Sequence, residues 1–152
     1  MKHILFFTLI LALSGCSSAP AAKNDSKQNT GFESLANIEW KLVEVRAAGN
    51  NVTLDRTTMK DEYTLNFTDS GINGRAFPNR YSAGYEAHSG ARLSFKPVIG
   101  TLMMALNDPY PVKESDYLKY LQSTDSWNII NGTLCLRGLL ETGSETLLFF
   151  SR

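Results

Sequence analysis

The segment WNIINGTLCL, residues 127–136, gives the strongest indication of the fold. Two runs of strand-forming residues, 127–130 and 134–136, flank the dipeptide Asn131-Gly132. This dipeptide favours the tight turn that joins two antiparallel strands, because both of its residues tolerate positive φ angles. The segment therefore predicts a β-hairpin near the end of the chain.

Strand patterns continue outward from this hairpin. Tyr63, Leu65 and Phe67 alternate with polar residues, and a period of two is typical of a half-buried strand. The dipeptides Asn73-Gly74 and Ser89-Gly90 are predicted as turns. The apolar segment 101–106 is compatible with either a strand or a helix. Further short strands are predicted at 40–45, 79–85, 93–95 and 147–150.

One helix is predicted, over residues 115–122. Ser115 is a good N-cap residue, and Tyr117, Leu118 and Leu121 fall on one face of a short helix. About seven or eight short strands in all lie before and after this helix. This order of elements predicts an α+β fold. The expected architecture is an antiparallel sheet curled like a β-barrel, with the late helix covering an open edge or mouth.

The first sixteen residues have the order of a bacterial lipoprotein signal. A basic start at Lys2 precedes the apolar run 4–13, which at ten residues is too short to span a bilayer as a helix. Ser14 and Gly15 then lead to Cys16, in a pattern that resembles the lipobox. We expect residues 1–15 to be a signal peptide and Cys16 to be the acylated residue that anchors the protein. Several acyl chains make such attachment effectively permanent.

Two further segments follow. Residues 16–34 are polar apart from Phe32, and such a composition predicts a flexible tether. Residues 35–152 are long enough for one folded domain. The whole chain has 15 basic and 15 acidic residues, so it has no broad basic field for nucleic acid. We expect a monomer whose only membrane contact is the lipid on Cys16.

The sequence contains no recognisable catalytic constellation. Cys16 is assigned to lipid, so Cys135 has no partner for an intramolecular disulfide and is interpreted as a buried strand residue. His88 is the one histidine after the signal, whereas a zinc site needs three or four ligands. We therefore expect no metal, no cofactor and no catalytic residue.

Aromatic and sulfur-containing residues supply the candidate recognition site. Its proposed members lie in the segment 79–85 and in the apolar segment 101–106. Arginine and tyrosine concentrate binding energy at interfaces, and methionine adapts to irregular apolar surfaces. The alternative is that these side chains only fill the core or satisfy a barrel rim. The candidates are Asn79, Arg80, Tyr81, Tyr85, Met103 and Met104.

An ordered set of short motifs extends over about residues 38–150. These motifs are Trp40-x-Leu42, Leu65-x-Phe67, Gly74, Asn79-Arg80-Tyr81, Gly84-Tyr85, Leu93-x-Phe95, Thr101-x-Met103, Glu114-x-x-Tyr117-Leu118, Leu121, Leu134-x-Leu136 and Phe149. In this order they resemble the META domain (HslJ-like) family. Two cysteines found in many members are absent, at Pro78 and Ala105, so any role of those thiols cannot be transferred to this chain.

The resemblance implies a mixed barrel-like fold, no established enzyme activity and a role in the bacterial envelope. Ser17 after the lipidated cysteine implies sorting to the outer membrane, on its periplasmic face. Anchoring at the inner membrane or at the cell surface is the alternative. Three functions are expected in decreasing order. The first is a non-enzymatic envelope protein that acts through protein contacts in stress tolerance or assembly. The second is a carrier of a lipid or small apolar ligand, or a pilot-like chaperone of a secretion machine. The third is an enzyme.

Overall fold

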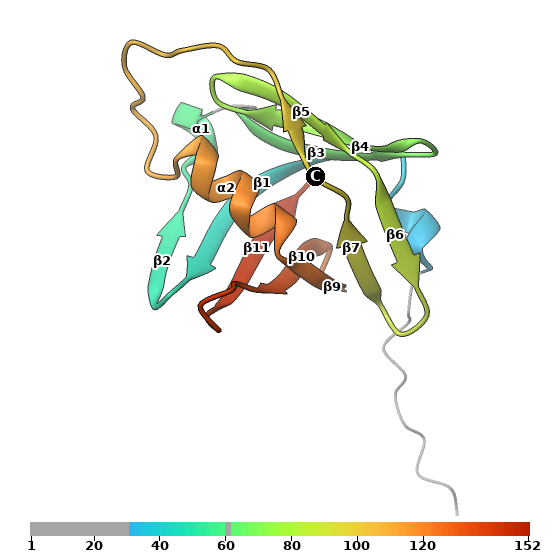
Figure 1. Cartoon of the computed structure of the whole chain (residues 1–152). Helices are drawn as coiled ribbons and strands as arrows, with labels where there is room; N and C mark the ends of the chain where they lie inside the picture. The colour runs from blue at the N-terminus through green and yellow to red at the C-terminus, as the bar shows by residue number, and fades with distance from the viewer. Residues whose placement is uncertain (1–30, 60–61) are drawn as a thin grey trace, which may run out of the picture.

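The computed structural model describes residues 31–59 and 62–152. The predicted signal peptide and Cys16 lie outside the described residues. The main elements form one curled antiparallel sheet with a helix late in the chain (Figure 1). In chain order the elements are η1 (Phe32–Leu35), β1 (Glu39–Ala47), β2 (Asn50–Thr53), α1 (Arg56–Met59), β3 (Tyr63–Thr68), β4 (Gly71–Ala76), β5 (Asn79–Ala83), β6 (Tyr85–His88), β7 (Arg92–Phe95), β8 (Ile99–Gly100), α2 (Glu114–Gln122), β9 (Thr124–Ile130), β10 (Thr133–Leu139) and β11 (Glu145–Ser151).

The sheet has the curvature of a half-barrel. Its strand order is β6-β7-β9-β10-β11-β1-β3-β4-β5-β8, and β2 pairs with β1 beside this path. β5 and β6 are separated only by Gly84, so they form one strand that bends and pairs with β4 at one end and with β7 at the other. β7 and β9 are joined at the single pair Arg92 and Ser126. The sheet is thus curled toward closure and weakly connected at β7–β9.

The predicted α+β class and curled antiparallel sheet are confirmed, but the predicted seven or eight strands are too few, because the sheet has eleven. Part of the error is β4, where the predicted turn at Asn73-Gly74 is wrong. These residues lie inside a strand paired on both sides. Gly74 serves close packing, since a Cβ there would lie 2.0 Å from the Thr64 carbonyl oxygen and 2.7 Å from Tyr81 Oη.

The hairpin predicted at Asn131-Gly132 is present between β9 and β10. Both turn residues have positive φ, 52° and 78°, as the tight turn requires. Ser89-Gly90 also turns the chain, between β6 and β7. The segment 101–106, for which strand and helix were both open, contains neither and forms the start of a long connection to α2.

Helix α2 crosses the open side of the curled sheet (Figure 1). Its Tyr117 and Leu121 are fully buried against the core. The helix begins at Glu114 with Lys113 at the cap position, so the predicted Ser115 cap is wrong. Ser115 lies within the first turn because the chain is still extended at Lys113, whose φ and ψ are −81° and 148°.

The C-terminal end of α2 protects an open strand edge. Gln122 Nε2 donates to the carbonyl oxygen of Phe95 at 2.9 Å, and its Oε1 accepts from the backbone N–H of Val98 at 2.9 Å. Where β7 leads into β8, the Gln122 amide thereby bonds the backbone groups that a neighbouring strand would otherwise bond. Unpaired strand edges otherwise invite pairing with other chains.

The sheet encloses a filled apolar core. Trp40, Phe67, Tyr117 and Phe150 are its largest fully buried side chains. Phe32 of η1, which falls inside the predicted tether 16–34, packs with Phe67 at a ring distance of 5.4 Å. In the described part of the chain, no helix is both long and apolar enough to cross a membrane.

Candidate functional site

Asn79 is the centre of the hydrogen bonds that organise the candidate residues. It is the first residue of β5 and is buried. Its Oδ1 accepts from Thr101 Oγ1 at 2.6 Å and from the backbone N–H of Met103 at 2.7 Å. Its Nδ2 donates to the Met103 carbonyl oxygen at 3.2 Å and to Glu114 Oε2 at 2.9 Å. The amide therefore ties the start of the 101–113 connection and the start of α2 to the sheet.

Tyr81 belongs to a buried hydroxyl pair. Its Oη lies 2.9 Å from Tyr117 Oη and donates to the Thr64 carbonyl oxygen at 2.7 Å. Burial raises the pKa of both tyrosines above the usual value. Both hydroxyls therefore stay protonated at neutral pH, and the pair joins β3, β5 and α2.

Tyr85 is the first residue of β6, directly after the bend at Gly84. Its ring is 5.0 Å from Phe32 and 5.8 Å from Phe67, and its hydroxyl donates to the Thr68 carbonyl oxygen at 3.2 Å. Phe32 also meets Trp127 at 5.8 Å. This aromatic cluster fixes η1 against the sheet, so the half-buried Tyr85 has a clear packing role.

Arg80 and the two methionines are the exposed members of the candidate set. Arg80 projects from β5, and its backbone N–H donates to Thr101 Oγ1 at 3.2 Å. Met103 is 57% exposed and Met104 is 90% exposed. Leu102 and Leu106 beside them are 98% and 104% exposed. The structure thus brings Asn79, Arg80 and the 101–106 segment together, and separates Tyr85 from them.

Sequence reasoning did not predict Thr101 and Glu114 as partners of Asn79. Both residues belong to the family-like pattern, but their contacts with Asn79 span 22 and 35 positions of the chain. Glu114 directly precedes the predicted helix 115–122, and no local pattern indicated its contact with Asn79.

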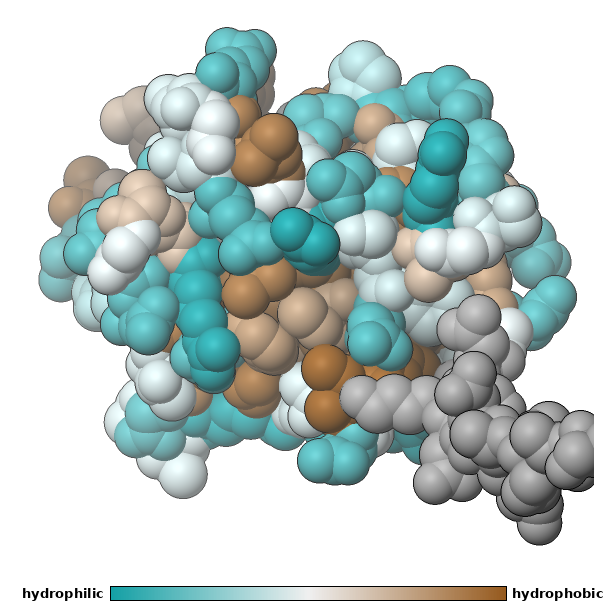
Figure 2. Space-filling view, turned by 90° about the horizontal axis from the view of Figure 1, so that it is seen from below, coloured by the Kyte–Doolittle hydropathy of each residue, from teal (hydrophilic) through white to brown (hydrophobic). Residues whose placement is uncertain are grey.

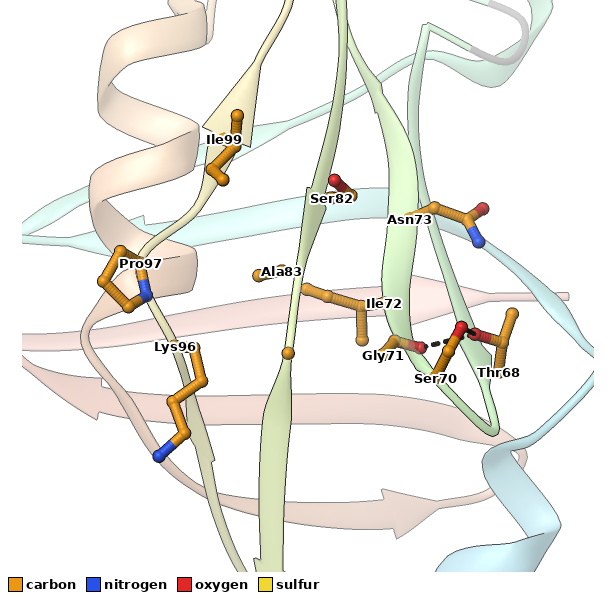
Figure 3. A pocket seen from close by; sticks show the side chains of 11 residues that line it. Thr68, Ser70, Gly71, Ile72, Asn73, Ser82, Ala83, Lys96, Pro97 and Ile99 are labelled. Carbon is orange, nitrogen blue, oxygen red and sulfur yellow. Dashed lines mark hydrogen bonds between the residues drawn. The ribbon is translucent and has the colours of Figure 1, made fainter.

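A shallow hollow of about 480 Å³ is lined by residues of β4 and β5, of the turn before β4 and of the segment that leads from β7 to β8 (Figure 3). In Figure 3 polar side chains such as Ser70, Asn73 and Ser82 surround it. Lys96 is its charged residue, and its ammonium forms an ion pair with Glu86. This lining provides hydrogen-bonding groups but no pair of acid and base.

The reactive side chains outside this region are dispersed. Burial raises the pKa of Cys135 on β10, which disfavours the nucleophilic thiolate. His88 is exposed at the end of β6, with Glu86 Oε2 at 3.9 Å. Across residues 31–59 and 62–152, no group of three His, Cys, Asp or Glu side chains is arranged to hold a metal ion.

These features define a class of small half-barrel domain in which one helix covers a curled antiparallel sheet and buried polar side chains tie the two together. The chain belongs to the META domain family, whose model matches residues 33–152. Among curated protein sequences, none matches it.

Two solved structures share the fold. One is a protein from Burkholderia xenovorans, with 21% identity and a TM-score of 0.58, covering 97% of this chain and 99% of its own. The other is a DUF4847 family protein from Bacteroides vulgatus, with 13% identity and a TM-score of 0.55, covering 80% of this chain and 98% of its own. At these identities the similarity establishes the fold and no function.

Proposed function

We propose that this protein is a lipoprotein of the bacterial envelope, anchored through acylated Cys16, whose domain acts without catalysis through contacts with other proteins. The processes served are envelope stress tolerance or the assembly of an envelope machine. The anchor is placed at the periplasmic face of the outer membrane, because Ser17 follows the lipidated cysteine. The domain works as a monomer.

One observation carries the proposal of protein contacts. Leu102, Met104 and Leu106 are almost fully exposed, and the Asn79 amide fixes the same segment to the sheet. Exposed apolar residues that gather on one surface commonly mark interaction sites. A fixed apolar segment therefore supports a binding surface better than a catalytic one.

A second candidate function, ligand carriage, is favoured by another surface. Figure 2 shows apolar residues gathered in the middle of the face seen from below, with polar residues around them. Such a surface suits an acyl chain as well as a protein. The large side chains that fill the core, such as Trp40 and Phe150, count against a ligand deep inside the sheet.

The two functions are separated by the contents of the purified domain. Residues 31–152 are produced without the signal and without Cys16, from the native host, and organic extracts are analysed by mass spectrometry. Protein contact predicts a domain without bound lipid. A stoichiometric fatty acid or phospholipid would instead establish a carrier.

The proposed anchoring in the outer membrane has a separate test. The full-length protein should co-fractionate with outer membranes on a density gradient. Ser17→Asp should shift it to the inner membrane, whereas Ser18→Asp, one residue further on, is the matched control and should shift it less. Recovery of the wild-type protein with inner membranes would contradict the proposed anchoring in the outer membrane.

A further inference from the structure

Residues 101–104 continue the pairing pattern of β8 along β5. The backbone N–H of Thr101 donates to the Arg80 carbonyl oxygen at 3.0 Å. Two residues further on, both the N–H and the carbonyl of Met103 are bonded to the Asn79 side chain. The main-chain groups of 101 and 103 therefore face the sheet, as alternate residues of a strand do.

The main-chain groups of Leu102 and Met104 face away from β5, toward the opposite edge of this segment. Within the described part of the chain, the backbone N–H groups of Leu102 and Met104 donate no hydrogen bond. Exposure alternates in the same register, being 98% at Leu102, 57% at Met103 and 90% at Met104. A strand edge with unpaired donors and an apolar row is the surface to which an extended peptide adds as a new strand.

We propose that residues 100–104 form a docking edge that accepts an extended apolar segment of another envelope protein. The partner strand pairs with the main chain at Leu102 and Met104, and its apolar side chains pack on the row formed by Leu102, Met104 and Leu106. This inference rests on the proposed function and specifies its contact surface and the kind of partner.

The chemistry of the segment defines the chemistry of the partner. No charged residue occurs between Gly100 and Asn107, so the segment itself offers an apolar peptide a surface without charges. Methionine side chains adapt to different apolar shapes. The exposed side chains of Ile99, Leu102, Met104 and Leu106 supply the apolar area that such a partner would cover.

The position of the edge favours a protein over the anchoring membrane. In Figure 1, η1, drawn in blue beside β6, lies at the opposite end of the domain from the connection 101–113, drawn in yellow to orange. Cys16 lies fifteen residues before Gly31, where the described residues begin. The proposed anchor at Cys16 therefore joins the domain through η1, at the end opposite the edge.

Site-specific photo-crosslinking in living cells tests the proposal. Benzoylphenylalanine is placed singly at Leu102, Met103 or Met104 of the full-length protein, with exposed Asn73 on β4 as the control position. The expected result is one protein adduct from positions 102 and 104, a weaker one from 103 and none from 73. Peptide mapping should place the attachment sites of 102 and 104 about two residues apart in one apolar segment, the spacing of a paired strand.

A synthetic peptide of the mapped segment then measures the contact directly. Met104→Lys should weaken its binding at least tenfold, whereas Leu139→Lys, at an apolar residue of β10 that is 58% exposed, should leave it unchanged. Adducts formed only with lipid, only with a second copy, or at scattered sites would overturn the proposal, as would no adduct. If crosslinking gives the predicted spacing while Cys16 carries no lipid, the anchor is refuted and the docking edge stands.

Discussion

The side chain of Asn79 holds Met103 by both of its main-chain groups, accepting from its N–H at 2.7 Å and donating to its carbonyl at 3.2 Å. The same amide reaches Thr101 and Glu114, so all of its hydrogen-bonding groups are occupied. This single buried residue therefore holds the exposed 101–106 segment in place and joins it to α2.

Replacing Asn79 should destabilise the domain. Asn79→Ala leaves Met103 main-chain groups and the Glu114 carboxylate without their partner, and loss of several such bonds costs about 2–4 kcal/mol. We expect the melting temperature to fall by roughly 10 °C in a domain of this size. Exposed Asn73→Ala is the matched control, with an expected change within about 0.5 kcal/mol. An unchanged melting temperature for Asn79→Ala would show that these bonds contribute little.

Gly74→Ala should be among the most damaging single substitutions. The added Cβ would lie 2.0 Å from the Thr64 carbonyl oxygen, which belongs to the backbone and cannot move away cheaply. We expect a loss of about 3 kcal/mol or more, measured by urea unfolding. Gly100→Ala is the control, since its Cβ would be at 3.5 Å or more from its neighbours. Equal stability of the two variants would refute the packing role of Gly74.

The buried tyrosines make stability depend on alkaline pH. Burial raises the pKa of Tyr81 and Tyr117 in the folded state, whereas in the unfolded state tyrosine titrates near ~10. Above about pH 10 the unfolded chain therefore releases protons that the folded chain retains, and stability should fall by up to about 1.4 kcal/mol per pH unit for each tyrosine. Below about pH 9 these two tyrosines should not make the free energy of unfolding depend on pH.

The variant Tyr117→Phe isolates the contribution of the Tyr117 hydroxyl to the pH dependence of stability. Unfolding free energies measured by urea titration from about pH 8 to pH 11 should fall less steeply for the variant than for the wild type above about pH 10. At neutral pH the variant should be less stable by about 1 kcal/mol, because the hydroxyl pair with Tyr81 is lost. Parallel alkaline slopes would contradict the raised pKa.

Arg80 and Tyr85 should behave differently when each is replaced by alanine. Tyr85→Ala removes a ring that contacts Phe32 and Phe67, so its melting temperature should fall by several degrees. Arg80→Ala changes an exposed side chain and should melt within about 2 °C of the wild type. If Arg80→Ala nonetheless loses the crosslinked partner, Arg80 belongs to the contact surface. Retained partner binding would confine the surface to the 101–106 segment.

Local patterns predicted much of this fold. The Asn131-Gly132 hairpin, the alternation over Tyr63–Thr68 and the late helix all follow from short-range periodicity and turn chemistry. β4 was missed because its glycines resemble turn residues, whereas Gly74 is required by Tyr81 and Thr64 from neighbouring strands. Such a requirement depends on contacts between distant segments, which local patterns do not encode.

The residues of the candidate site could be predicted from the sequence to a similar extent as the fold. Composition singled out Asn79, Arg80 and the methionines, and the structure places them together. Their division into buried and exposed members depends on the tertiary fold, since Asn79 is buried while Met104 is 90% exposed. The role of these residues in recognition stays a prediction.

Acylation of Cys16 is the most direct test of the central claim, that this is a membrane-anchored lipoprotein. Cells producing the full-length protein are labelled with a clickable palmitate, and the purified protein is compared with Cys16→Ala and with Cys135→Ala. We expect the wild type and Cys135→Ala to incorporate label and partition into membranes, and Cys16→Ala to do neither. Equal labelling of the wild type and Cys16→Ala, or no labelling of either, would contradict it.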